Sequence, residues 1–185
     1  MTRQDFIKTL AIASILAVLL SLVSGTHAAP ITKAATGTDL TAGTSWTGST
    51  APGSGDVATW ASTSLGAGLT LGTSRSWSGI SVASALSAIG VTGAGTLTLG
   101  TDGINMASSA VDLSIGTPLA LGANQTWIVN SGRTLTASGI ISSTSTGLTK
   151  AGSGTRRIED LVSGTDTVVQ NTYSGGTIMN SGTLI

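Results

Sequence analysis

The sequence predicts an all-β protein, a right-handed parallel β-helix (β-solenoid) preceded by a signal peptide helix. Composition, the spacing of short apolar runs and an internal repeat support this prediction. The 185-residue chain is 40% hydrophobic but only 9% charged, with 26 Gly and no Cys. Its single Glu excludes a coiled coil, and the lack of Cys excludes a disulfide framework or a thiolate zinc site. Eight basic residues balanced by eight acidic ones leave no basic patch for nucleic acid.

Residues 1–28 have the pattern of a secretory signal peptide. Arg3 and Lys8 precede a mostly apolar run at 10–23, and Thr26-His27-Ala28 resembles a small-x-small cleavage site. A spanning helix needs about 20 apolar residues, so we expect a cleaved signal rather than an uncleaved membrane anchor. The protein is therefore expected to be exported. The only histidine, His27, would leave with the signal.

The rest of the chain predicts short strands separated by glycine turns. From residue 36 onward there is no helical period, and apolar residues alternate with small polar ones, which indicates strands with one inward face. The clearest runs are 69–71, 80–82, 97–99, 104–106, 113–115, 119–121 and 127–129. Glycine follows or precedes nearly every run, as tight turns require.

The spacing of these runs favours a solenoid over a hairpin sandwich. Successive runs begin at 97, 104, 113, 119, 127 and 135, closer together than the strands of a sandwich usually are. Three such strands per turn would give about 20 residues per rung and roughly seven or eight rungs. At about 4.8 Å per rung, the column would be roughly 35 Å tall.

An internal repeat supports the solenoid. Residues 69–77 and 119–127 both read L-x-L-G-x4-W, and residues 97–100 repeat the opening without the Trp. In a repeat array each rung contacts only its neighbours, so sparse apolar residues suffice for a thin core. Disorder is the alternative, mainly at 30–45 and 142–146, but the hydrophobic content and the sustained alternation argue against it.

Residues 147–155 and 171–184 carry a family resemblance. They read G-L-T-K-A-G-S-G-T and N-T-Y-S-G-G-T-I-M-N-S-G-T-L. This pair resembles the autotransporter-associated β-strand repeat of bacterial surface proteins. The resemblance implies a right-handed parallel β-helix passenger that is exported and displayed at the cell envelope. The expected location is therefore the cell surface, the outer membrane or the extracellular space. Upstream, Trp46, the turn at 52–56, Trp60 and residues 76–80 look like the regions that precede such repeats.

Two features depart from the family pattern. Residues 156–170 hold two basic and three acidic residues between the two half-motifs. They are either a projecting loop that binds a partner or a solvated insertion, which could arise from a locally altered coding frame. Because of their charge, we do not expect them to stack as an ordinary rung. The second departure is that no membrane barrel follows the last repeat, so we expect a fragment of a longer protein or export by other means.

These observations divide the chain into five segments. They are a signal peptide at 1-28, an N-terminal cap or irregular region at 29-62, β-helix rungs at 63-155, a charged insertion at 156-170, and a truncated final repeat segment at 171-185.

The sequence predicts no catalytic, cofactor-binding or metal-binding residues, and no cofactor. The mature acidic residues are Asp39, Asp56, Asp102, Asp112, Glu159, Asp160 and Asp166. Asp102 and Asp112 lie about half a rung apart, so we expect their side chains on different faces of the column. Glu159 and Asp160 are adjacent, and neighbours on a strand face opposite ways. No histidine remains in the mature chain to act as a base. We therefore expect no enzyme.

The four tryptophans allow a binding interpretation and a packing interpretation. Trp46, Trp60, Trp77 and Trp127 could stack on sugar rings if they were exposed in a row. We expect instead that Trp77 and Trp127, at matched repeat positions, pack in the core, and that Trp46 and Trp60 pack together as an N-terminal cap.

The expected function is an exported structural or surface-display β-helix module, such as a passenger stalk or adhesin segment, without catalysis. The alternative is a carbohydrate-binding or carbohydrate-active β-helix. Expected partners are surface glycans or other cell-envelope components. We expect no nucleic acid partner and no stable membrane insertion of the mature segment.

Overall fold

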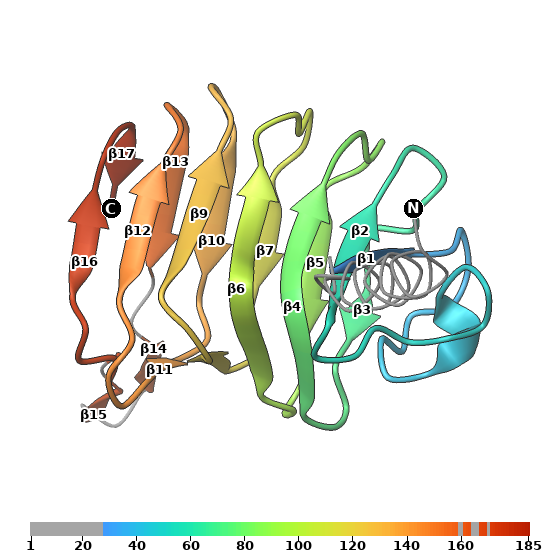
Figure 1. Cartoon of the computed structure of the whole chain (residues 1–185), viewed down its shortest axis with the longest axis horizontal. Helices are drawn as coiled ribbons and strands as arrows, with labels where there is room; N and C mark the ends of the chain where they lie inside the picture. Colours follow the sequence, from blue (N-terminus) through green and yellow to red (C-terminus); the bar gives the residue numbers. More distant parts are fainter. Residues whose placement is uncertain (1–27, 159–160, 164–166, 170) are drawn as a thin grey trace, which may run out of the picture.

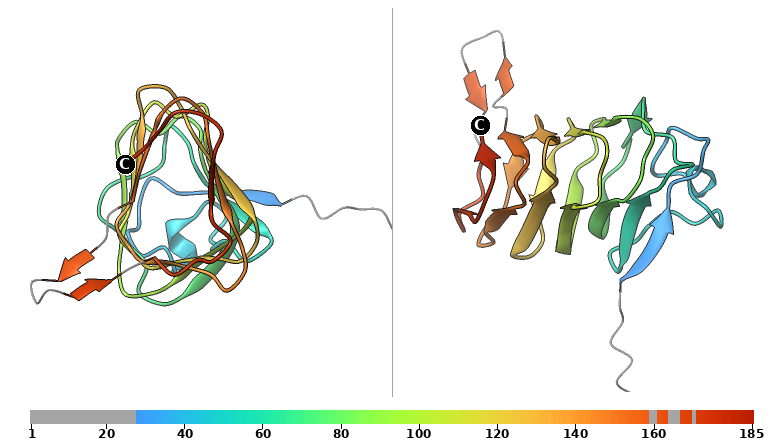
Figure 2. Two further views of the ribbon diagram at one scale, coloured as in Figure 1. Left: turned by 90° about the vertical axis from the view of Figure 1, so that its left-hand side faces the viewer. Right: turned by 90° about the horizontal axis from the view of Figure 1, so that it is seen from above.

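The computed structural model describes residues 28–158, 161–163, 167–169 and 171–185; the predicted signal peptide helix lies outside these residues. The chain is 45% strand and 2% helix, and its parallel sheets wind into a β-solenoid of about 6 turns. Seen end-on, the turns superimpose as a triangular column (Figure 2). The predicted parallel β-helix is confirmed.

Two long parallel sheets and a shorter set of pairings form the three faces of the column (Figure 1). The first face contains β1 (Ala29–Thr32), β2 (Asp56–Trp60), β4 (Arg75–Val82), β6 (Leu97–Met106), β9 (Gln125–Val129), β12 (Leu148–Ala151) and β16 (Thr177–Met179). The second contains β3 (Leu69–Thr70), β5 (Ile89–Thr92), β7 (Leu113–Ile115), β10 (Thr134–Ala137), β13 (Thr155–Ile158) and β17 (Thr183–Leu184). On the third, β8 (Leu119–Leu121) pairs with β11 (Ile141–Ser142) and with the start of β6.

Each turn is longer than the spacing of the apolar runs suggested. Leu113 pairs with Leu135, and the Thr134 N–H donates to Asp112, 22 residues earlier. The turn from β4 to β6 is longer still, because Ser78 meets Asp102, 24 residues on, at a register shift between Trp77 and Gly79. The prediction of seven or eight rungs was therefore too high, since bulges and corner residues lengthen each turn.

Along most strands, alternate residues are buried and fill a continuous core. In β9, for example, Gln125, Trp127 and Val129 are buried, while Thr126 and Ile128 are half-buried on the outer side. Registers align the buried residues of successive turns, so that Ile104 lies beside Trp127 and Trp127 beside Lys150. Small polar residues cover the outer side, as the period-2 alternation predicted.

Residues 33–50 close the N-terminal end of the column. This segment contains the 3-10 helix η1 (Gly43–Ser45) and bonds to β3 through Leu40 N–H and the Thr70 carbonyl at 2.9 Å. The ring of Trp46, which belongs to this segment, packs edge to face against the ring of Trp60 in β2, with centroids 5.7 Å apart. The expected packing of these two residues is confirmed, and Trp77 joins them 5.6 Å from Trp46.

The segment at 156–170 differs in part from the expectation. Arg156 to Ile158 belong to β13 and pair with β10 as an ordinary rung. Beyond them, β14 (Leu161–Ser163) and β15 (Thr167–Val169) form a two-stranded antiparallel hairpin that projects from the side of the column (Figure 2). The charge of Arg156 does not prevent stacking, because its guanidinium lies over the ring of Trp127 in the rung below.

Candidate functional site

The described carboxylates all accept hydrogen bonds, either within a tight turn or from a neighbouring turn of the column. The carboxylates of Asp56 and Asp112 accept backbone N–H groups of Gly53 at 2.8 Å and Thr134 at 2.9 Å. Asp102 accepts the hydroxyl of Ser78. Among the described residues no three acidic, His or Cys side chains come together as a metal site. Glu159, Asp160 and Asp166 lie outside the described residues.

Asp39 is engaged in the same way. Its Oδ1 accepts the N–H of Thr41 at 2.8 Å and the Thr41 hydroxyl at 2.7 Å. These hydrogen bonds lower the pKa of Asp39 below its ordinary value. The group is therefore an ionised turn anchor at neutral pH rather than a proton donor.

All four tryptophans are buried. Trp46, Trp60, Trp77 and Trp127 are 2%, 0%, 1% and 0% exposed. Trp127 donates its indole N–H to Gln125 at 2.9 Å inside the column. None of the four offers a ring face to solvent, so the row of exposed aromatics that would stack on sugars is not present.

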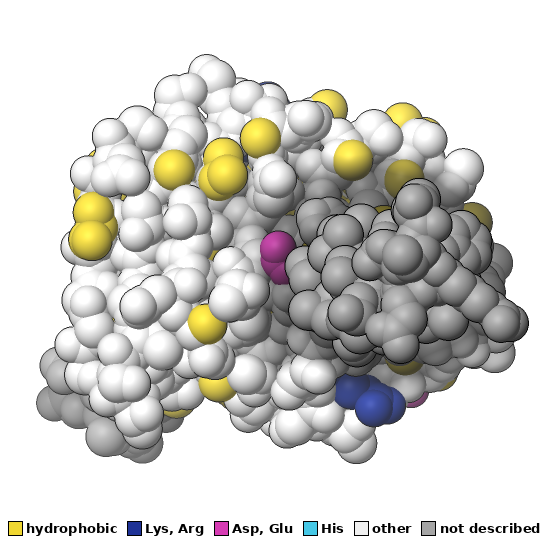
Figure 3. All heavy atoms as spheres, in the orientation of Figure 1, with side chains coloured by type: hydrophobic (Ala, Val, Ile, Leu, Met, Phe, Trp, Pro, Cys, Tyr) yellow, Lys and Arg dark blue, Asp and Glu magenta, His cyan; other side chains and the backbone are white. Residues whose placement is uncertain are grey.

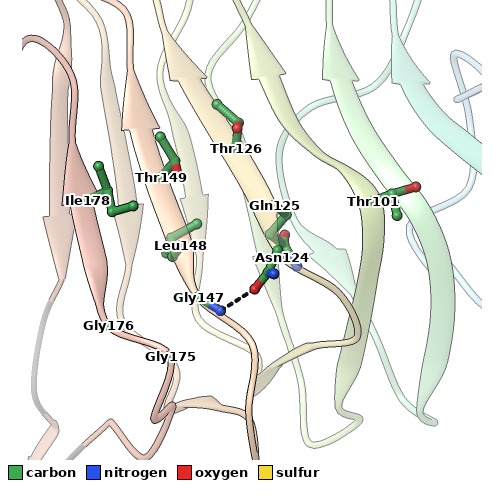
Figure 4. A pocket seen from close by; sticks show the side chains of 10 residues that line it. All are labelled: Thr101, Asn124, Gln125, Thr126, Gly147, Leu148, Thr149, Gly175, Gly176 and Ile178. Atoms are coloured by element: carbon green, nitrogen blue, oxygen red, sulfur yellow. Dashed lines mark hydrogen bonds between the residues drawn. The ribbon is translucent and has the colours of Figure 1, made fainter.

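The candidate functional site is a groove on the outside of the first face. It has a volume of about 400 Å³ and runs from the middle of β6 across the N-terminal parts of β9, β12 and β16 (Figure 4). Its lining residues are Thr101, Asn124, Gln125, Thr126, Gly147, Leu148, Thr149, Gly175, Gly176 and Ile178. Its volume lies within the range of small-molecule sites.

A row of aligned outward side chains forms the middle of the groove. Thr126 aligns with Thr149, and Thr149 with Ile178, on three neighbouring strands. At one end of the groove, Asn124 accepts the N–H of Gly147 at 2.7 Å (Figure 4). In the space-filling view this side of the column is mostly uncharged outside the undescribed residues, with isolated hydrophobic atoms (Figure 3).

The groove is lined entirely by uncharged residues. Gln125 points inward, with its amide bonded to the Leu99 carbonyl at 3.1 Å. Threonine hydroxyls, one amide and the apolar Ile178 suit a neutral, hydroxyl-bearing ligand.

The sequence reasoning did not identify this groove. Its signal is the alignment of G-A-N-Q-T-W, S-T-G-L-T-K and S-G-G-T-I-M, which places Thr126, Thr149 and Ile178 in one column. The alignment does not show how the corners of successive turns lie relative to one another, so it does not predict a groove there.

Two buried lysines were also missed. Lys33 and Lys150 are both 0% exposed and begin the matching segments K-A-A-T-G and K-A-G-S-G. The Lys33 ammonium donates to the carbonyls of Ala34 at 3.0 Å and Thr36 at 2.8 Å. The Lys150 ammonium likewise donates to the carbonyls of Ala151 at 2.9 Å and Gly152 at 2.6 Å. In both places an inward lysine satisfies the carbonyl groups of the corner that follows it.

The stability contributed by the Lys150 position is expected to rise with pH. Burial, and secondly the charge of Arg156, lower the pKa of Lys150 below its ordinary value of 10.5. Between the folded-state pKa and 10.5 the unfolded chain therefore binds more protons, so the free energy of unfolding increases with pH. Urea unfolding from pH 7 to 10.5 should show this increase for the wild type relative to Lys150→Met. A pH-independent difference between the two would contradict the prediction.

Arg156 is the third buried cation and is the least satisfied. It is 0% exposed, and its Nε and both Nη atoms have no hydrogen-bond acceptor. Its guanidinium carbon lies 4.5 Å from the centroid of the Trp127 ring, a cation–π contact. Burial lowers the pKa of Arg156, and the nearby Tyr173 hydroxyl offsets part of this effect.

Replacing Arg156 with methionine is expected to stabilise the protein by about 1 kcal/mol. The change removes an unpaired buried charge and keeps an apolar chain of similar length, and such replacements are often stabilising. The lost cation–π contact reduces the gain. Chemical denaturation measures the change, with Arg157→Met as control because Arg157 is exposed on the outer side of the same strand. A loss of stability for Arg156→Met would contradict this prediction.

Comparison with protein-family models, curated proteins and solved structures produced no match. In the described part of the chain, no helix has the length and apolar character needed to cross a bilayer. The groove and the buried cations are therefore interpreted from their own geometry.

Proposed function

We propose that this protein is an exported structural module that displays its outer surface at the cell envelope, in the manner of a passenger stalk or adhesin segment. The observation that carries the proposal is the continuous column of parallel strands, about 6 turns long. Neighbouring turns hold such a column along its whole length, so it serves as a stiff spacer. Catalysis is not part of the proposal.

Two further features support a structural role, and a third supports export. The carboxylate of Asp56 holds a tight turn, and those of Asp102 and Asp112 bond to a neighbouring turn of the column. The buried lysines do the same for the carbonyl groups of two other corners. The charge pattern at 1–23 and the small residues that follow support export.

The export part of the proposal is tested with a reporter enzyme that is active only outside the cytoplasm. Fusion to residues 1–28 is expected to give activity, and the Arg3→Glu/Lys8→Glu variant of the same fusion is expected to reduce it. Equal activity of the fusion and an unfused reporter would contradict export.

The display part is tested on the full chain. An epitope inserted in the exposed turn at residues 53–55 should be accessible to antibody on intact cells and lost after protease treatment. Antibody binding only after the cells are broken would contradict display while leaving export standing.

A second candidate function is the binding of a neutral carbohydrate, and the groove is the observation that favours it. Thr126 and Thr149 are aligned on neighbouring strands, and both line the groove. A glycan array probed with the full chain tests this function, with Thr149→Val as the matched variant. Thr136→Val, on the outer side of β10, is the control. Equal signals from all three proteins would contradict binding in the groove.

A further inference from the structure

The groove on the first face runs along the axis of the column, across the strands rather than beside one of them (Figure 4). Its lining residues come from β6, β9, β12 and β16, which are successive strands of one parallel sheet, and from the corners that precede them. Neighbouring strands of a sheet lie about 4.8 Å apart, so the groove extends over three spacings, roughly 14 Å. A site of this length suits an elongated ligand.

Successive turns place equivalent residues in the groove. Thr126 pairs with Thr149 and Thr149 with Ile178, so one row of outward side chains crosses β9, β12 and β16. Asn124 and Gly147, two positions before the two threonines, are joined by the hydrogen bond from the Gly147 N–H to Asn124 Oδ1 at 2.7 Å. The lining of the groove therefore repeats with the period of one strand spacing. A ligand that makes the same contact with each turn must repeat with this period too.

The groups in the groove match a neutral, hydroxyl-bearing ligand. Thr126 and Thr149 are half-buried, and a threonine hydroxyl can both donate and accept a hydrogen bond. The amide of Asn124 uses its Oδ1 for the Gly147 N–H, and its Nδ2 is a donor. Ile178 adds apolar surface to the same row. An acidic polymer would lose hydration here without meeting a positive charge, because every lining residue is uncharged.

An extended polypeptide matches this repeat poorly. The side chains on one side of an extended peptide recur about every 6.8 Å, whereas neighbouring strands of the sheet are about 4.8 Å apart. A peptide that binds by strand addition also lies parallel to the strands, whereas the groove crosses them. In an extended β-linked glycan the advance per pyranose unit is close to the strand spacing. Each sugar unit can therefore face one strand.

We propose that the groove binds a linear, extended, neutral glycan that lies along the axis of the column, with successive sugar units over β9, β12 and β16. The hydroxyls of Thr126 and Thr149 bond to neighbouring units, and Ile178 packs against the apolar side of the next unit. The inference rests on the binding of a neutral carbohydrate proposed above, and it does not depend on export or display.

The probes are glucose, cellobiose and cellotriose, which are neutral and represent one, two and three units of a β-linked chain. In NMR titrations of the isotope-labelled full chain, the dissociation constant should fall about tenfold with each added unit, because each unit adds a hydrogen bond or an apolar contact on one more strand. Maltotriose has the same composition but a curved, α-linked chain, and trigalacturonate is acidic. Both should bind at least tenfold more weakly than cellotriose.

The orientation of the glycan is measured in the same spectra. The signals of Thr126, Thr149 and Ile178, which form one row across three strands, should shift together when cellotriose binds. Ile128 and Ala151 lie two residues further along β9 and β12 and pair with each other, and their signals should change little. A ligand parallel to the strands would instead shift Thr149 and Ala151 together and leave Thr126 unchanged.

The variant Thr149→Val tests the middle of the row. It keeps the shape of the side chain and removes the hydroxyl, so cellotriose binding should weaken about tenfold while the unfolding midpoint stays at that of the wild type. Thr136→Val is the matched control, because Thr136 is half-buried on the outer side of β10, on the second face. It should bind cellotriose as the wild type does.

Four results would overturn the inference and leave the binding of a neutral carbohydrate standing. They are equal affinities for glucose and cellotriose, equal affinities for cellotriose and maltotriose, shifts confined to one strand, and unweakened cellotriose binding by a folded Thr149→Val variant. A fifth result, no shift with any glycan of the series or of the array at millimolar concentration, would overturn both the carbohydrate function and this inference.

Discussion

Replacing Gly139 with alanine is expected to destabilise the protein by about 3 kcal/mol or more, as overpacking a close contact does. Gly139 lies at a corner between β10 and β11 and is buried. A β-carbon there would overlap the carbonyl oxygen of Thr117 in the turn below and lie 2.5 Å from its carbonyl carbon. Both atoms belong to the backbone, so the clash can be relieved only by separating two turns of the column.

Gly90→Ala is the matched control for this prediction. Gly90 is a strand residue of β5 between two buried residues, and a β-carbon there would meet nothing within 4 Å. Its replacement should change the free energy of unfolding by less than about 1 kcal/mol, with stabilisation expected from the lower entropy of the unfolded chain. Urea denaturation followed by far-UV circular dichroism measures both variants. Similar effects of the two substitutions would mean that the turns are not in the close contact described.

Replacing Trp60 with alanine is expected to cost about 3–5 kcal/mol, the range for removing a fully buried tryptophan from a core. Trp60 is 0% exposed and lies between the cap and the first full turn. Its ring centroid is 5.7 Å from that of Trp46 and 6.4 Å from that of Trp77. The substitution therefore leaves a cavity beneath residues 33–50 and removes two aromatic contacts.

Two phenylalanine variants separate cavity formation from loss of the indole N–H. Trp60 donates to the Leu65 carbonyl at 3.3 Å, whereas the buried N–H of Trp77 has no acceptor. Trp60→Phe should therefore be more destabilising than Trp77→Phe, by about 1 kcal/mol. A Trp60→Ala variant that unfolds at the same urea concentration as the wild type would contradict the first expectation. A larger loss of unfolding free energy in Trp77→Phe than in Trp60→Phe would contradict the second. Since Trp60→Phe keeps most of the ring, it remains measurable even if the alanine variant does not fold.

Local patterns were enough to predict the strand positions. The alternation at 97–99, 113–115 and 127–129 corresponds to β6, β7 and β9, because one residue in two must face a narrow core. The matched segments 69–77 and 119–127 begin in β3 and β8, which lie on different faces of the column. The two segments therefore share a sequence pattern but do not occupy equivalent positions in the solenoid.

The groove and the buried cations could not be predicted from these patterns. Lys33 and Lys150 belong to the interior because their ammonium groups reach carbonyls of the following corner. Arg156 was expected in a charged insertion or loop that does not stack as a rung, and it is inside, where its guanidinium lies over the ring of Trp127 one turn below. From residue type alone, a charged residue on a strand is predicted to face solvent, because burying a charge is costly. Whether neighbouring groups in the fold compensate that cost is not visible in the sequence.

The sequence by itself determined the fold class and the strand positions, because period-2 alternation and glycine turns act between residues close in the chain. Only the tertiary structure decided the length of a turn and the burial of all four tryptophans and of three cations. These properties depend on which residues lie one above another, about 22 positions apart in the chain, as Asp112 and Thr134 do. Bulges and corners shift that register by a few residues, and each shift changes which side chains meet across the core.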